Sequence, residues 1–217
     1  MESFRFKILA FNACILATMA FAVETFAQVK ENVNFKAGIA AYQANNLPLA
    51  YKEFLTAASS GHADSQFNLA LMYEHGIGVA KDEKEAVVWY GKSAAQDNSA
   101  AQYNLGVLYE NGRGTAVDFA KANEWYRKAA VQGDPLAIGN LGMLYIRGQG
   151  VKENRIAGLA LLLVSATMDP SPQNHAKQNI STTQGLSSEM IAEAQVLAQE
   201  LSSANNFLNP LDNYLKE

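Results

Sequence analysis

The chain has 217 residues, of which 49% are hydrophobic and 18% charged, and its formal net charge is −4. This length and composition suit a folded domain with a sizeable core and exclude a disordered chain. The weak acidic excess, with no basic run, argues against a nucleic-acid partner, because binding phosphates requires clustered lysine and arginine.

Residues 1–27 have the pattern of a secretory signal peptide. Arg5 and Lys7 give a positive start, an apolar run follows, and small-residue cleavage sites end at Ala22 and Ala27, of which we favour Ala27. The alternative is an uncleaved anchor, which ranks second because the apolar run is shorter than the roughly 20 residues of a spanning helix. We expect a periplasmic or secreted protein that is not inserted in a membrane once the signal has been cleaved.

The single cysteine, Cys14, lies inside this apolar run, in a context that fits a lipoprotein signal poorly. The expected mature chain then has no thiol for a disulfide, a metal site or a nucleophile. Helix packing must therefore supply its stability.

The dominant feature is a repeat with a period of 36 residues. Segment 66–78 returns as 102–114, and part of it returns again within 140–150. Likewise Trp89-Tyr90 returns as Trp125-Tyr126. Each unit is predicted to form two helices, because the apolar residues of its first part fall on one face of a helix over about residues 99–110.

A Gly-x-Gly pair ends the first helix of each unit, as at Gly112 and Gly114. A phosphate-binding loop is rejected, because no strand precedes the pair and no Gly-Lys-Ser/Thr follows it. The second helix is predicted to begin at a capping residue that recurs in phase, as Asp82, Asp118 and Asn154.

The ends of the chain depart from the repeat. Residues 156–166 are apolar nearly all round and predict a buried helix, covered by a helix pair over about 173–183 and 188–201. The Asn-rich tail is either loose or pinned back by Phe207, Leu211 and Tyr214. The expected organisation is a signal peptide (1–27), an N-terminal helix pair (33–62), two regular units (63–98, 99–134), a degenerate third unit (135–170), a C-terminal capping pair (171–203) and a tail (204–217).

These residues resemble the Sel1-like repeat (SLR) family, a relative of tetratricopeptide (TPR) repeats. The pattern that carries the resemblance is Leu105-Gly106, Tyr109, Gly112 and Gly114, Ala122, Trp125-Tyr126 and Ala129-Ala130. The third unit departs from it, with Leu161-Leu162 in place of Trp-Tyr.

The resemblance implies an all-α fold, a right-handed superhelix of antiparallel helix pairs with a concave face lined by the first helices. It also implies a protein that holds other proteins together. Exported bacterial members are similar in acting as regulators, host-interaction factors or inhibitors of toxic enzymes. A cysteine-rich subgroup is associated with penicillin binding, and a mature chain without cysteine does not resemble it.

No catalytic constellation is apparent in the sequence. The three histidines, His62, His75 and His175, have neither metal-ligand spacing nor a neighbouring carboxylate cluster, and no nucleophile elbow occurs. We therefore expect no enzyme activity, no metal and no cofactor.

The predicted binding surface consists of in-phase positions on the first helices. Asparagine recurs at one position, where its amide either holds an extended peptide or ties neighbouring units together. The adjacent positions vary between units, so they either set specificity or form a solvated face. The candidate residues are Asn68, Leu71, Glu74, His75, Asn104, Val107, Glu110, Asn111, Asn140, Met143 and Arg147.

The leading hypothesis is an adaptor that binds another protein in the groove. The alternatives are a dedicated inhibitor of a secreted toxic enzyme such as a phospholipase, a regulator of a membrane sensor, and an enzyme or binding protein that acts on the cell wall.

Overall fold

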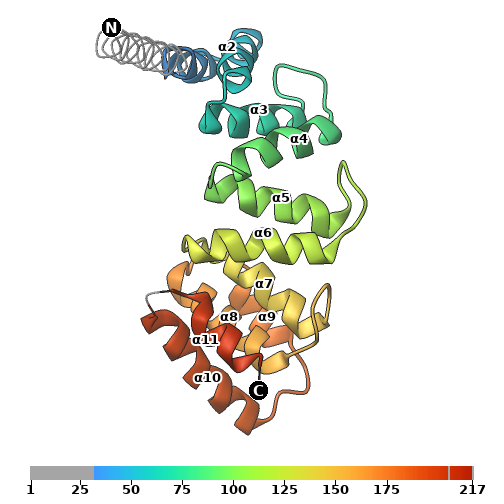
Figure 1. Ribbon diagram of the computed structural model, residues 1–217, viewed down its shortest axis with the longest axis vertical. Coiled ribbons are helices and arrows are strands. Elements are labelled where there is room, and N and C mark those ends of the chain that lie inside the picture. Colours follow the sequence, from blue (N-terminus) through green and yellow to red (C-terminus); the bar gives the residue numbers. More distant parts are fainter. Residues whose placement is uncertain (1–31, 205, 217) are drawn as a thin grey trace, which may run out of the picture.

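The computed structural model describes residues 32–204 and 206–216 and shows a stack of helices (Figure 1). The predicted signal peptide and its cleavage sites lie outside the described residues. Residues 32–43 are helical and pack with α2, and no strand occurs in the described part of the chain. The further helices are α2 (Leu47–Ser59), α3 (Ala63–His75), α4 (Glu83–Ala94), α5 (Ser99–Asn111), α6 (Phe119–Val131), α7 (Pro135–Arg147), α8 (Arg155–Met168), α9 (Ala176–Thr182), α10 (Ser188–Ser203) and α11 (Leu208–Tyr214).

From α2 to α8, helices that follow one another in the chain pack side by side, so this part of the chain advances along the molecule (Figure 1). The pairs α3–α4, α5–α6 and α7–α8 form successive layers, and α4–α5 and α6–α7 join them. This arrangement confirms the expected all-α solenoid. Across the described residues, no helix combines the length and the apolar content needed to cross a bilayer.

The Gly-x-Gly turns lie along one edge of the stack (Figure 1). The first glycine ends the first helix in the left-handed conformation, with φ of 65° at Gly112 and 64° at Gly148. The second glycine lies against the preceding unit: a Cβ at Gly114 would collide with the backbone carbonyl of Glu83, and a Cβ at Gly150 would collide with that of Phe119. The turn therefore brings the backbones of neighbouring units together.

The predicted capping residues begin the second helices. Asp82, Asp118 and Asn154 each accept a hydrogen bond from a backbone N–H of the first turn. At the first helices, Asn98 and Asp134 do the same, and His62 accepts the N–H of Ser65 through its Nδ1 atom at 3.1 Å.

Tyrosine and small residues fill the spaces between the helices. Tyr90 and Tyr126 are fully buried. Glycine on the first helix has a steric reason, since a Cβ at Gly106 would meet the ring of Tyr126 at 2.6 Å. Substituting a larger residue there would push the two helices of the unit apart.

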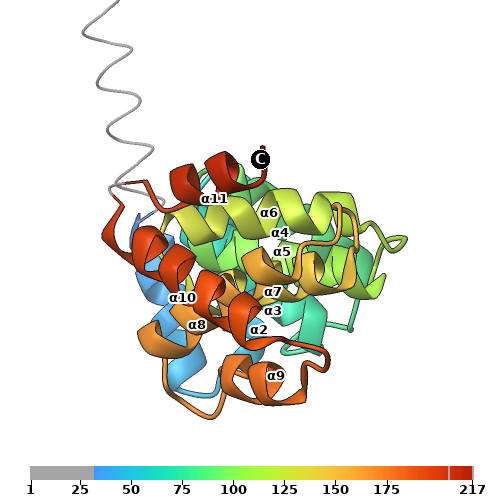
Figure 2. The ribbon, with the colours of Figure 1, turned by 90° about the horizontal axis from the view of Figure 1, so that it is seen from below.

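The C-terminal end closes the stack (Figure 2). α8 is buried along most of its length, and α10 packs across it, as expected. α9 is shorter than the predicted helix over 173–183. The tail forms a further helix, α11, which the sequence left open: Leu208 and Leu211 are buried, and Asp212 pairs with Arg127 of α6.

Candidate protein-interaction surface

The first helices of the three repeat units present their in-phase positions in three rows. We call these rows together the first-helix surface. The first row is Asn68, Asn104 and Asn140, the second is Leu71, Val107 and Met143, and the third is His75, Asn111 and Arg147.

The asparagine row is half-buried, and its amide nitrogens are already engaged. Asn68 and Asn104 donate to the carbonyl oxygens four residues earlier in their own helices, at 2.7 and 3.0 Å. Asn140 instead donates to the hydroxyl of Tyr126 at 3.0 Å, which ties α7 to α6. The amide oxygens of Asn68 and Asn104 are the atoms left to accept a hydrogen bond from a partner.

The second row is apolar and half-buried. Leu71 and Val107 pack on their inner side against the core and keep part of their surface outside. Met143 occupies the same position in the third unit and lines a surface cavity. This row offers an apolar stripe whose residue type changes from unit to unit.

The third row is exposed and differs in charge between units. His75 is 54% exposed at its side chain and stands 4.0 Å from a carboxylate oxygen of Glu74. Asn111 donates to the carbonyl of Val107 at 2.9 Å, and Arg147 pairs with no acidic group among the described residues. The positive end of the row therefore lies in the third unit.

Glu74, predicted to be a groove residue, lies in the interior. It is 7% exposed, accepts a hydrogen bond from the hydroxyl of Tyr90 at 2.6 Å and pairs with Arg113 at 2.9 Å. Glu110 repeats the first contact, accepting from Tyr126 at 2.6 Å, and is half-buried. Both carboxylates face their partner helices, where they accept from a buried tyrosine hydroxyl that requires an acceptor. Glu74 is therefore not part of the binding surface, and Glu110 makes a structural contact.

Arg113 is a structural residue that the sequence did not reveal. It is the middle residue of its Gly-x-Gly turn, and its guanidinium also donates to Glu83 at the start of α4, at 2.8 and 3.1 Å. The pair with Arg113 lowers the pKa of the Glu83 carboxyl, and Glu83 in turn raises the pKa of Arg113. The available signal was the change of the middle residue from Ile77 to Arg113 to Gln149.

Buried amides near the start of the first helices join neighbouring units. Gln66 and Gln102 donate to the carbonyls of Ala58 and Ala94 in the preceding unit. Within their own units they accept from Gln96 and Gln132 at 2.7 and 2.8 Å. These contacts are in phase with the repeat. An inspection of the glutamines at 36-residue spacing would have found them.

The histidines do not form a site. His62 caps α3, His75 lies on the surface, and His175 is exposed just before α9. Within residues 32–204 and 206–216, no cluster of three or more His, Cys, Asp or Glu side chains could hold a metal ion.

A cavity of about 500 Å³ lies where the first-helix surface reaches the third unit. Met143 and Arg147 of α7 form one wall, and the start of α8 and residues 182–184 form the others. The cavity therefore joins two predicted residues to a segment outside the repeats.

Comparison with known proteins gives the family model of the Sel1 repeat, which matches residues 63–98, 99–134 and 135–170. Among curated proteins, DAP3-binding cell death enhancer 1 of Rattus norvegicus is 49% identical over 49 residues, 23% of this chain and 10% of the relative. The exopolysaccharide production negative regulator of Rhizobium meliloti is 32% identical over 103 residues, 44% of this chain and 38% of the relative. The chain thus spans well under half of either relative.

Two solved structures share the fold. A Sel1 repeat protein from Oxalobacter formigenes superposes with a TM-score of 0.61 at 27% identity, covering 80% of this chain and 72% of its own. A protective antigen present in uropathogenic Escherichia coli strains, which displays an SLR fold, superposes with a TM-score of 0.64 at 30% identity. The match covers 87% of this chain and 46% of the antigen. Sel1 repeat proteins generally mediate protein–protein interaction through a scaffold that is typically not enzymatic. With three matched repeats and these structural neighbours, the chain belongs to the Sel1 repeat family.

Proposed function

We propose that the protein is an exported, non-catalytic adaptor that binds a partner protein on its first-helix surface. The observation that carries this proposal is the contrast within each unit. In the first two units the positions that hold the stack together are buried and repeat closely. The second and third rows are accessible and change from Leu71 to Val107 to Met143 and from His75 to Asn111 to Arg147. Variation at the accessible positions of a recurring frame suits recognition of one particular partner.

The test compares two variants of matched chemistry. The surface variant carries Leu71→Asp and Val107→Asp, and the control variant carries Val88→Asp and Val131→Asp on the second helices, where these valines are 48% and 51% exposed. The tagged full chain is expressed in its own cells, crosslinked and purified, and the captured proteins are identified by mass spectrometry. Circular dichroism checks that both variants keep their helices.

A protein captured by the wild type and by the control variant, but lost with the surface variant, is the expected result. If the surface variant captures the same proteins as the wild type, the first-helix surface is not the binding face. Export is tested on the same cells by fractionation and N-terminal sequencing. The expected mature N-terminus is Gln28, and an intact chain in the cytosol would contradict export.

A second candidate is a dedicated regulator or inhibitor. It is favoured by the name of the Rhizobium meliloti relative, a negative regulator of exopolysaccharide production. It differs from an adaptor in forming a tight complex of fixed stoichiometry with one enzyme or sensor. Size-exclusion chromatography of the captured complex, followed by an activity assay of the partner with and without the chain, distinguishes the two.

A further inference from the structure

The cavity at the third unit has walls that the first two units do not have. One wall comes from α7, with Met143, Ile146 and Arg147. A second wall is formed at the start of α8, by Glu153 just before the helix and by Arg155. The third wall is residues 182–184, the end of α9 and the two residues after it. The last wall exists because the chain continues past the repeats and packs α9 against α8 (Figure 2). This end of the first-helix surface is therefore a hollow.

The charged groups in the cavity walls are two arginines and one glutamate. Arg155 donates through Nη2 to the carbonyl of Gln184, which holds its guanidinium in place and leaves its other donors available. Arg147 is exposed and pairs with no acidic group among the described residues. A guanidinium presents several N–H donors in a plane that matches a carboxylate, so a pair of them lining one hollow suits that group.

We propose that this cavity binds a carboxylate side chain in an acidic segment of the partner protein. The inference rests on the proposed function and specifies the chemistry of the partner. Charge complementarity carries it: the whole chain has a net charge of −4, whereas the cavity walls carry an excess of one positive charge. An acidic segment is repelled by the molecule at large and attracted at this place, which fixes the direction in which it lies along the surface.

Apolar residues lie beside the cavity and along the surface that leads to it. Met143 supplies apolar surface beside the two guanidinium groups, and the stripe of Leu71 and Val107 continues along the earlier units. A segment with apolar residues that ends in an acidic residue matches this order. The acidic residue lies at the third unit, and the apolar residues lie along the second row.

The test uses two pools of short fluorescein-labelled peptides that differ at two adjacent fixed positions and are random elsewhere. One pool has glutamate at the fixed positions and the other has glutamine. Binding to the purified full chain is followed by fluorescence anisotropy. We expect the glutamate pool to bind about tenfold more tightly than the glutamine pool, with the difference shrinking as salt is added.

Three single variants identify the cavity as the site. Arg147→Gln is expected to weaken binding of the glutamate pool about tenfold, and Glu153→Gln, which removes the opposing charge, is expected to tighten it a few fold. Lys177→Gln makes the same charge change as Arg147→Gln on exposed α9 and is expected to leave binding unchanged. A gain from Glu153→Gln is not expected of a residue with a merely structural role.

Equal binding of the two pools, or equal loss with Arg147→Gln and Lys177→Gln, would overturn the carboxylate site. The proposed function fails separately, by capture of the same partners with the Leu71→Asp, Val107→Asp variant. If that variant loses its partner while Arg147→Gln changes nothing, the adaptor stands and the acidic segment is wrong.

Discussion

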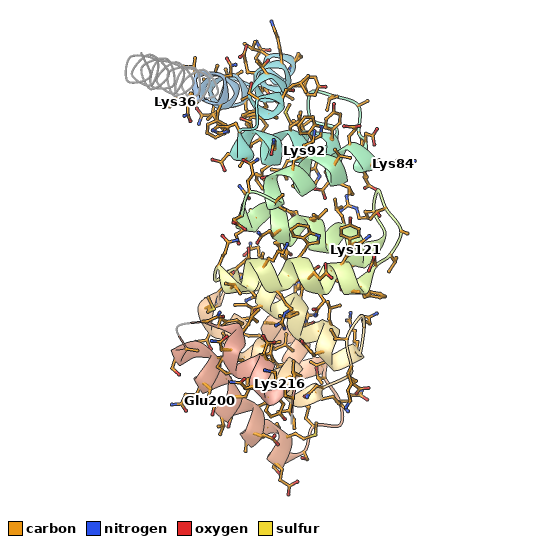
Figure 3. All side chains as sticks on the ribbon, viewed as in Figure 1. Lys36, Lys84, Lys92, Lys121, Glu200 and Lys216 are labelled. Atoms are coloured by element: carbon orange, nitrogen blue, oxygen red, sulfur yellow. The ribbon has the colours of Figure 1, made fainter. Side chains whose placement is uncertain are left out.

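Arg113 joins two consecutive repeat units through one guanidinium. It pairs with Glu74 of α3 and with Glu83 at the start of α4, and Tyr90 donates to the other carboxylate oxygen of Glu74. If Arg113 were replaced, the carboxylate of Glu74 would lose a charged donor. Because Glu74 is buried, water could replace that donor only in part. The contact therefore contributes more to stability than the exposed ion pair of Asp118 with Lys121, which is labelled in Figure 3.

We expect Arg113→Gln to lower the free energy of unfolding by about 1–3 kcal/mol, measured by urea denaturation followed by circular dichroism. Glutamine is chosen because the third unit carries it at the equivalent position, Gln149. Arg147→Gln serves as the control, since an exposed arginine without an ion pair is expected to change stability by no more than about 0.5 kcal/mol. Equal effects of the two changes would show that the Arg113 contacts contribute nothing particular.

The lowered pKa of Glu83 predicts a dependence of stability on pH. Its hydrogen bonds with Arg113 and Lys81 hold its pKa below the ordinary value of 4.5, so the folded state favours the charged carboxylate. The resulting stabilisation is fully present above pH 4.5 and is lost as the pH falls through the lower folded-state pKa. The melting temperature of Glu83→Gln should therefore lie below that of the wild type at pH 7, and the difference should shrink toward pH 3. A difference that stays constant over this range would exclude the carboxylate as its source.

The sequence predicted local contacts of single residues better than distant ones. Asp82 and Asp118 are recognisable as helix caps because a cap bonds to residues two or three positions ahead. Glu74 was misplaced because its position on the helix agrees with a surface row, and only the fold brings Arg113, 39 positions later, against it. For the same reason Arg155 was missed, since the carbonyl of Gln184 that it meets lies outside the repeats.

At the scale of helices and turns, glycine has opposite roles at two positions. Gly114 has φ of 68° and leaves no room for a Cβ beside Glu83, whereas Gly91 lies inside α4, where an added Cβ would have no neighbouring atom within 4 Å. The first glycine is required by the turn. The second costs helix stability relative to alanine.

Gly91→Ala is accordingly expected to stabilise the protein by about 0.5–1 kcal/mol, and Gly114→Ala to destabilise it by at least about 1 kcal/mol. Thermal and urea unfolding of both variants measure whether each change raises or lowers the free energy of unfolding. Destabilisation by Gly91→Ala, or tolerance of Gly114→Ala, would contradict the geometry described for these positions.

The repeat pattern gave the regular helices but did not settle the tail. α11 is short and rich in polar residues, so the sequence does not decide between a loose tail and one pinned by Phe207, Leu211 and Tyr214. The structure shows the pinned form, with Leu211 buried and Phe207 and Tyr214 partly buried against the same core cluster. What orders it is tertiary: the ion pair of Asp212 with Arg127 and the hydrogen bond from Tyr214 to Glu193. The partners of such contacts, here Arg127 and Glu193, lie too far away in the sequence for a local pattern to identify them.

Over the whole molecule, buried apolar residues are distributed unevenly. The largest cluster of buried residues spans α6, α7, α8, α10 and α11. Among residues 32–204 and 206–216, the buried members of the cluster at the N-terminal end are Ala41, Ala50, Phe54 and Met72. In a stack where each unit contacts only its neighbours, stability follows this local burial.

Amide hydrogen exchange is therefore expected to be slowest in α7 and α8 and fastest in residues 32–43 and α2. Mass spectrometry of peptides from exchanged samples reads both regions in one experiment. Uniform protection from one end to the other would mean that the stack opens only as a whole.

The close approach of the second turn glycine to the preceding unit has a consequence for how such a chain can change. At Gly114 the backbone of one unit rests on the backbone of another, so atoms that every residue shares limit how closely the units approach. The side chains of the first-helix surface take no part in that contact. Units can therefore be exchanged, duplicated or given new surface residues while the spacing of the array stays the same, and a new partner can be acquired without redesigning the scaffold.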